Sequence, residues 1–269
     1  MTYESATYFF KILLMKPNEE DMKEVRNIRL DLAYDGGRYH GWQRQKNAIT
    51  IQALLEEKLQ NMLGAAVILI GAGRTDAGVH ALSQTCNFKT KSKLDPGTIR
   101  RGLNALLPED ILIKRAAYVI QNFHARYEAK NKTYEYRLLN RPEPDIFLRY
   151  YTWHIPQELD LAAMEACLPH LRGRHDFSSF KSSGSHIKNP IREMMRADLV
   201  RGDEGHVTLV FQADGFLRHM VRNMVGTLVQ VGRGKWDPGG FGHILEVKDR
   251  RAAGKKSPPQ GLFLMGIQY

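Results

Sequence analysis

The chain between residues 67 and 80 reads Val67-Ile68-Leu69-Ile70-Gly71-Ala72-Gly73-Arg74-Thr75-Asp76-Ala77-Gly78-Val79-His80. Residues 67–70 are apolar, uncharged and rich in β-branched side chains, which predicts a buried strand that ends at a sheet edge. The glycines that follow allow tight turns and a close approach of the backbone to a ligand. This stretch therefore predicts a sheet-based fold in which a strand leads into an acidic loop.

Two charged side chains on this loop define its chemistry. Arg74 and Asp76 place a guanidinium near a carboxylate. A neighbouring positive charge stabilises an ionised aspartate even where burial favours the protonated form. The pattern indicates a nucleophilic carboxylate or an ion pair. The plainer alternative is an aspartate that caps its own turn by hydrogen-bonding to the local backbone.

Dinucleotide binding is another alternative for the same loop. Gly71-Ala72-Gly73 follows the expected strand, and Asp95 lies at roughly the distance of a ribose-binding acid. The sixth position of that fingerprint is Asp76, however, and its charge would face a pyrophosphate. The next expected strand, residues 84–88, begins too soon for a crossover helix of about ten residues or more. No Gly-Lys-Ser/Thr follows, which excludes a Walker-type phosphate loop.

Length and charge narrow the class of partner. The chain has 269 residues and a formal net charge of +10, enough for one large or two small domains with a basic surface. Such an excess without a long lysine tract is typical of a protein that binds a polyanion, and nucleic acid is the leading candidate. Cys86 and Cys167 lie in separate apolar contexts, as reduced core residues of a cytosolic protein do. The ten histidines form no His-Glu-x-x-His pattern, so we expect no metal.

The N-terminal residues 1–27 lack regular patterning. Residues 9–15 are apolar but contain Lys11, and no basic segment precedes them, which predicts neither a signal peptide nor a membrane span. Alternation of polar and apolar residues begins at residues 29–34, and Met22 is an alternative start. We expect residues 1–27 to be a poorly ordered extension or a start-site artefact.

Strand and helix patterns alternate along the rest of the chain. Thr50 is a plausible N-cap and Gly64 a stop for a helix over residues 51–63, and Asp95-Pro96 opens a second helix that ends before Pro108. A boundary is expected near residues 121–125, between an N-terminal half, residues 28–124, and a C-terminal half, residues 125–269. Further strands are expected over residues 84–88, 111–119 and 132–138, and a third helix over residues 160–171 with Pro169 in its last turn.

A second informative stretch covers residues 216–229. Its apolar residues recur at helical spacing, and Arg218 and Arg222 are four residues apart, which predicts that they share a helix face. Unless they are solvated, two like charges so placed require a carboxylate or a phosphate, and a cleft that holds Asp76 or an RNA backbone would supply either. The alternative is a solvated basic face on an ordinary core helix.

Two other stretches are candidates for RNA contact. Residues 123–134 interleave aromatic side chains with cations, which suits a surface that stacks an unpaired base and holds phosphates. Their alternative is a half-exposed strand whose aromatic rings pack on a sheet. Residues 181–189 form a basic loop, and most such loops are solvent-facing connections.

Several separated motifs together resemble the TruA family of tRNA pseudouridine synthases. The likeness spans residues 29–269, and the motifs follow one another in the family's order. The segment before residue 28 has no counterpart in the usual pattern. The motifs are Tyr34-Asp35-Gly36, Gly41-Trp42-Gln43, Gly73 to Ala81, Phe123 to Tyr127, His175-Asp176-Phe177, Phe216 to Gly226, and Gly261 to Leu264.

This resemblance implies an α/β (α+β) fold of two similar halves, each an antiparallel-rich sheet backed by helices, with a central basic cleft. It also implies a cytoplasmic homodimer that isomerises uridine to pseudouridine at positions 38, 39 and 40 in the anticodon arm of tRNA, without a cofactor. The implied catalytic residues are Asp76, its ion-pair partner Arg222, and Tyr127 against the target base. The residues expected to contact RNA are Arg74, Thr75, His80, Arg126, Arg218, His219, Lys181 and Lys188.

The implied reaction fits an ionised aspartate. Uracil is detached from the ribose at N1, turned over and rejoined through C5, so no atom or electron leaves. Asp76 can attack uracil C6 or ribose C1′, or it can abstract a ribose proton to give a glycal, and the sequence does not choose among these routes. A basic RNA-binding protein without activity remains the alternative, and it predicts tRNA binding that is indifferent to Asp76→Asn.

Overall fold

The computed structural model describes residues 25–182 and 189–269, which divide into two compact units. The first contains residues 25–77 and 81–129, and the second contains residues 78–80 and 130–269. The short segment directly after the Asp76 loop thus groups with the second unit. Of the expected N-terminal extension, residues 1–24 lie outside the described residues, whereas Arg26 and Asn27 belong to the first strand.

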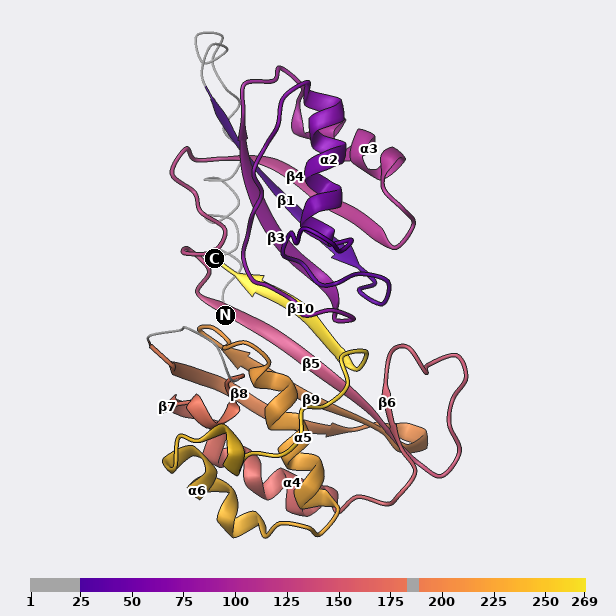
Figure 1. Cartoon of the computed structure of the whole chain (residues 1–269), viewed down its shortest axis with the longest axis vertical. Coiled ribbons are helices and arrows are strands. Elements are labelled where there is room, and N and C mark those ends of the chain that lie inside the picture. Colours follow the sequence, from indigo (N-terminus) through magenta and orange to yellow (C-terminus); the bar gives the residue numbers. More distant parts are fainter. Residues whose placement is uncertain (1–24, 183–188) are drawn as a thin grey trace, which may run out of the picture. The chain divides into compact units, whose positions relative to one another are not determined.

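The first unit is an antiparallel sheet with two helices (Figure 1). Strand β1 pairs with β3 on one side and β4 on the other, and the short strand β2 pairs with β3. Ile28, Leu30 and Leu32 alternate along β1 and are completely buried, as expected where one face of a strand meets the core. The elements are β1 (Arg26–Tyr34), α2 (Ile51–Leu63), β2 (Ile70–Gly71), β3 (His80–Thr90), α3 (Pro96–Leu106) and β4 (Ile111–Val119).

Side-chain caps start both helices of this unit where the sequence predicts them. The Thr50 hydroxyl accepts a hydrogen bond from Ala53 N at 3.4 Å, and the Asp95 carboxylate accepts one from Thr98 N at 3.0 Å. Gly64 ends α2 in the left-handed conformation, with φ of 69°. These caps satisfy backbone groups that lack a partner within the helix, so the helix boundaries are set locally.

The predicted strand over residues 67–70 is wrong for most of its length, because only Ile70 joins a ladder. Leu69 N donates to Glu56 Oε1 at 2.9 Å, and Leu69 O accepts from Gln52 Nε2 at 3.1 Å. Side chains of α2 therefore satisfy this backbone in place of a neighbouring strand. Ile68, expected to be buried, is 72% exposed.

The second unit contains a longer antiparallel sheet of order β10-β5-β9-β8-β7, with β6 parallel beside β5. Helix α4 packs against α5, and α6 contacts β7 and the 3₁₀ turns. The strands are β5 (Asn131–Asn140), β6 (Trp153–Ile155), β7 (Gly173–Asp176), β8 (Ile191–Arg201), β9 (His206–Ala213) and β10 (Leu262–Gln268); the helices are α4 (Leu161–Cys167), α5 (Met220–Gly232) and α6 (Phe241–Glu246).

The third predicted helix is shorter than expected. Asp160 caps it as predicted, with its carboxylate accepting from Ala163 N at 2.8 Å, but the α-helix ends at Cys167. Leu168–Leu171 form a 3₁₀ turn instead. Pro169 has no N–H to donate, so the regular ladder cannot continue through it.

The predicted α/β class, with antiparallel-rich sheets backed by helices in both parts of the chain, is confirmed. Buried residues in each unit come from alternate strand positions and from the helix faces that meet them. Among the described residues, no helix has the length and apolar character needed to span a membrane.

Candidate active site

The Asp76 loop, residues 72–79, connects β2 to β3. Asp76 is half-buried, Arg74 beside it is exposed, and Thr75 between them is buried. The Thr75 hydroxyl lies 2.8 Å from the Tyr34 hydroxyl on β1. Burial raises the pKa of Tyr34 to about 12, so this phenol keeps its proton at neutral pH.

The segment that carries Gly41 and Trp42 braces this loop from a second direction. Trp42 N donates to Thr75 O at 3.1 Å. Gly41 has φ of 87°, and a Cβ there would lie 2.5 Å from Thr75 O. A Cβ on Gly71 would lie 2.5 Å from Trp42 Nε1. Close approach therefore requires both glycines, and backbone conformation requires Gly41 as well.

These bracing residues were not predicted from the sequence. Gly41 and Trp42 entered only as part of the family resemblance, and no local pattern indicates that they hold Thr75. Gln84 opens the strand expected over residues 84–88, but the sequence does not show that this polar residue is completely buried. Its Nε2 donates to Gly73 O at 2.9 Å and so holds the start of the loop.

His80 follows the loop and is 2% exposed. Its ring stacks on Phe263, with centroids 4.7 Å apart, and Nε2 lies 3.1 Å from Tyr150 O. Tyr151 packs on the same ring at 5.3 Å. His80 was expected to contact RNA; its ring is packed inside the second unit, and its contact with RNA stays a prediction.

Helix α5 carries Arg222, which is 6% exposed. Arg222 Nε donates to Ser257 O at 2.9 Å, and Ser257 N donates to Arg222 O at 3.0 Å. Twelve of the thirteen residues of α5 are buried, so it is a core helix of its unit. The guanidinium charge is thus held in place inside the unit.

Residues 253–259, which we call the strap, run along α5 and contact both the helix backbone and Arg222. A Cβ on Gly226 would lie 1.8 Å from Lys255 O, so helix and strap backbones are in direct contact. Gly254 N donates to the Thr227 hydroxyl at 2.9 Å, and Arg250 Nη2 donates to Gly254 O at 2.9 Å. Arg222 and the strap are therefore built as one rigid group.

Arg218 and Arg222 do not share a helix face, which corrects the sequence prediction. His219 has φ of 63°, in the left-handed region, and α5 begins only at Met220. Arg218 thus precedes the helix and is exposed. The Ser182 hydroxyl contacts His219 Nδ1, and Ser182 N donates to Arg218 O at 3.1 Å. Lys181 is half-buried next to this junction, whereas Lys188 lies outside the described residues.

Residues 123–134 form a turn followed by a strand, and only part of the aromatic and cationic stretch is on the surface. Phe123 and Tyr134 are buried, while the Tyr127 side chain is 76% exposed. The Tyr127 ring stacks on His124 with centroids 4.1 Å apart, and the Arg126 guanidinium lies 5.8 Å from the Tyr127 ring centre. This places an exposed aromatic platform with a cation beside it.

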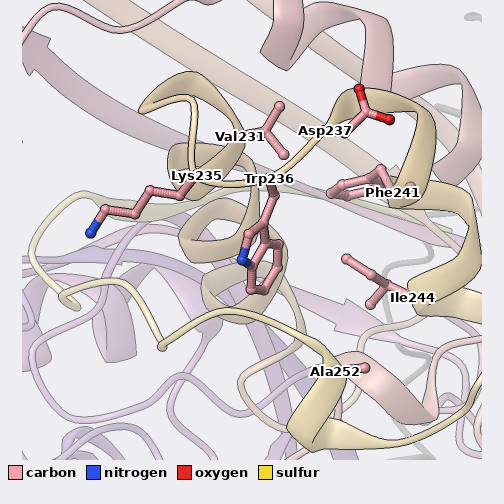
Figure 2. Close-up of a pocket in the computed structure, with 8 residues that line it drawn as sticks. Val231, Lys235, Trp236, Asp237, Phe241, Ile244 and Ala252 are labelled. Atoms are coloured by element: carbon pink, nitrogen blue, oxygen red, sulfur yellow. The ribbon is translucent and has the colours of Figure 1, made fainter.

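A separate pocket of about 370 Å³ lies at the end of α5 (Figure 2). None of the residues predicted for the site lines it, and its walls are mainly apolar, so it is no candidate for the chemistry considered above. Its lining includes Val231, Lys235, Trp236, Asp237, Phe241, Ile244 and Ala252. Across the described residues, no group of three or more histidine, cysteine or acidic side chains is placed to hold a metal.

The fold and these features define a class: an α/β protein with an acidic, glycine-flanked loop, a buried arginine on a core helix and an exposed aromatic and cationic turn. The model of the tRNA pseudouridine synthase family matches residues 32–128 and 168–269. The chain belongs to this family. The matched residues include the Asp76 loop, Tyr127 and helix α5.

Curated relatives agree over nearly the whole chain. A tRNA pseudouridine synthase A of Acetivibrio thermocellus is 43% identical over 245 residues, which is 91% of this chain and 100% of the relative. One of Thermoanaerobacter sp. is 44% identical over the same shares. Among solved structures, a Cbf5-Nop10-Gar1 complex has a TM-score of 0.35 and 12% identity, over 81% of this chain and 48% of that chain. That structural similarity is too low to carry an argument.

Proposed function

We propose that this protein isomerises uridine to pseudouridine at positions 38, 39 and 40 in the anticodon arm of tRNA. The observation that carries this proposal is the family match, which includes the Asp76 loop and helix α5. The relatives named tRNA pseudouridine synthase A align along their full length with 245 residues of this chain. The formal net charge of +10 suits a polyanionic substrate.

Asp76 is the proposed catalytic group. Its loop is held at Gly73 O by Gln84 and at Thr75 O by Trp42 N, so the carboxylate has a defined position before substrate arrives. Prior positioning of this kind lowers the barrier because less freedom is lost on reaching the reactive geometry. The carboxylate attacks C1′ or C6, or takes a ribose proton, and these three routes remain open.

Arg222 is the proposed ion-pair partner of Asp76. A guanidinium has five N–H donors in a fixed plane, and the Nε donor goes to Ser257 O. We assign the pairing with the Asp76 carboxylate to the Nη groups. The positive charge would keep Asp76 ionised when a bound nucleotide excludes water.

Tyr127 is the proposed aromatic contact of the target base, and Arg74 the proposed aid to extruding the nucleotide. An exposed ring beside Arg126 can stack on an unpaired uracil. Taking the nucleotide out of the RNA stack costs a few kcal/mol, which stacking and phosphate contacts offset. The reaction removes the proton from C5 and returns one to N1, and the phenol of Tyr127 is a candidate to accept the C5 proton.

A cytoplasmic homodimer completes the proposal. The support for a dimer is an exposed apolar group in the loop before β6: Ile146 is 64% exposed, Phe147 81% and Tyr150 60%. Clustered exposed apolar side chains mark interaction surfaces more often than single ones do. We assign this loop to the contact between two copies of the chain.

The proposal is tested on an unmodified tRNA transcript with uridine at positions 38, 39 and 40. After incubation with dialysed, chelator-treated protein, pseudouridine is mapped by its carbodiimide adducts, which stop reverse transcriptase. We expect stops at these positions and none in a transcript that carries cytidine there. Stops elsewhere would reject the proposed sites. Tight tRNA binding with no pseudouridine would favour the alternative of a non-catalytic RNA-binding protein.

A further inference from the structure

Behind the Asp76 loop, three polar side chains of the first unit form a buried hydrogen-bonded chain. Gln84 is completely buried, Tyr34 is 4% exposed and Thr75 is 6% exposed. The Tyr34 hydroxyl lies 2.8 Å from the Thr75 hydroxyl and 3.5 Å from Gln84 Nε2. Burying a polar side chain costs free energy unless it is hydrogen-bonded, so three polar residues at apolar core positions are expected to have a function.

The chain has a direction, because the orientation of the Gln84 amide is fixed at both ends. Its Nε2 donates to Gly73 O at 2.9 Å, and its Oε1 accepts from Thr85 N at 3.2 Å. The second Nε2 proton therefore faces the Tyr34 oxygen, which acts as the acceptor. We assign the proton of the 2.8 Å contact between the two hydroxyls to Tyr34, which then donates to the Thr75 oxygen.

Hydrogen bonds hold Thr75 at two of its atoms. Its hydroxyl oxygen lies 2.8 Å from the Tyr34 hydroxyl, and its carbonyl oxygen accepts from Trp42 N at 3.1 Å. Gly41 closes the space behind that carbonyl, since a Cβ there would lie 2.5 Å from it. Thr75 is the residue before Asp76, so these contacts limit the rotation of the peptide that carries the carboxylate.

We propose that Gln84, Tyr34 and Thr75 form a positioning relay that sets the place of the Asp76 carboxylate. The inference rests on the proposed function, in which Asp76 is catalytic. Tyr34 is too buried to touch RNA, so it acts through Thr75 and not on the substrate. Displacement of a reacting group by about 1 Å can lower a rate by about 100-fold, which sets the scale of the effect.

The test compares Tyr34→Phe with Tyr39→Phe in pseudouridine formation on an anticodon-arm RNA. Both changes remove one phenol hydroxyl from the first unit, but the Tyr39 hydroxyl donates to Asp110 at 2.6 Å and does not belong to the chain of Gln84, Tyr34 and Thr75. We expect Tyr34→Phe to lower kcat by about 10- to 100-fold with KM unchanged. Tyr39→Phe should keep the wild-type kcat.

Two changes at Thr75 keep the test decisive if Tyr34→Phe folds poorly. Thr75→Val removes the hydroxyl at constant volume and should lower kcat as Tyr34→Phe does, while Thr75→Ser should lose less. The double variant Tyr34→Phe/Thr75→Val should be no slower than either single variant, because each single change already removes the same hydrogen bond between the two hydroxyls. Wild-type kcat in Tyr34→Phe or Thr75→Val, or losses that multiply in the double variant, would overturn the relay. An inactive wild-type protein would instead reject the proposed function.

Discussion

Arg218 and Arg222 lie four residues apart in the sequence, but Arg218 is exposed and Arg222 is buried. The left-handed conformation of His219 starts α5 at Met220, so only Arg222 lies within the core helix. Helical periodicity in the sequence cannot reveal such a break, since only a few per cent of non-glycine residues adopt this conformation. Caps are different: Thr50 and Asp95 bond to backbone groups three residues away, and their side chains are readable in the sequence.

Arg222 should tolerate lysine poorly. Lysine keeps the positive charge but has no donor at the Nε position, so Ser257 O loses its partner in a buried place. We expect Arg222→Lys to lower the free energy of unfolding by about 1–2 kcal/mol in urea titrations. The exposed Arg218→Lys is the matched control and should change it by less than about 0.5 kcal/mol. Equal effects of the two changes would contradict the burial of Arg222.

Tyr34 should make stability depend on alkaline pH. Burial raises its folded-state pKa from 10.0 to about 12, so the unfolded chain loses this proton first as pH rises. Because the unfolded state then binds fewer protons, the free energy of unfolding falls between pH 10 and 12, by about 1.4 kcal/mol per pH unit for one such group. Tyr34→Phe should flatten this slope in urea titrations at pH 9, 10 and 11. An unchanged slope would contradict the assignment.

At the scale of elements, local signals predicted helices α2 and α3 and strands β4 and β5, whereas tertiary contacts decided other elements. α2 and β4 lie where periodicity and caps place them. Residues 67–70 look like a strand, yet Gln52 and Glu56 of α2 take their hydrogen bonds. Strands β8 and β9 had no predicted counterpart. Whether a segment pairs with a strand or with helix side chains depends on which residues the fold brings close to it, and a short stretch of sequence does not contain this information.

The contact of α5 with the 253–259 strap should be sensitive to a single methyl group. A Cβ at Gly226 would lie 1.8 Å from Lys255 O, so Gly226→Ala must displace the strap or the helix. We expect a loss of about 1–3 kcal/mol in the free energy of unfolding, together with reduced activity, since Arg222 is tied to the strap. The control is Gly240→Ala, where an added Cβ meets no atom within 4 Å. A stable, active Gly226→Ala protein would contradict this packing.

On the scale of the whole molecule, family membership connects residues that lie far apart in the sequence and in different units. The candidate catalytic residues are distributed over both units, Asp76 and Tyr127 in the first and Arg222 in the second. Their residue types were predictable from the motifs, but the residues that brace them were not. Gly41, Trp42, Gln84 and the strap around Ser257 contact backbone atoms of residues far away in the sequence, and no local pattern indicates which atoms these are.

The exposed loop before β6 should control association. Phe147→Ser removes the most exposed of its apolar side chains, and truncating a central interface residue costs about 2 kcal/mol or more. We expect the wild-type protein to sediment as a dimer and Phe147→Ser to dissociate about 30-fold more readily. Ile68→Ser, at a 72% exposed position of the first unit, should leave the dimer intact. A monomeric wild-type protein would contradict the dimer.

The most direct test of the account replaces Asp76 by asparagine and measures release of tritium from C5 of uridine in a labelled tRNA anticodon arm. Wild-type protein and the control Asp203→Asn, at an exposed position of the second unit, should release label at the same rate. Asp76→Asn should bind the RNA with similar affinity but release label at least about 1,000-fold more slowly. Equal release by wild type and Asp76→Asn would contradict the central claim.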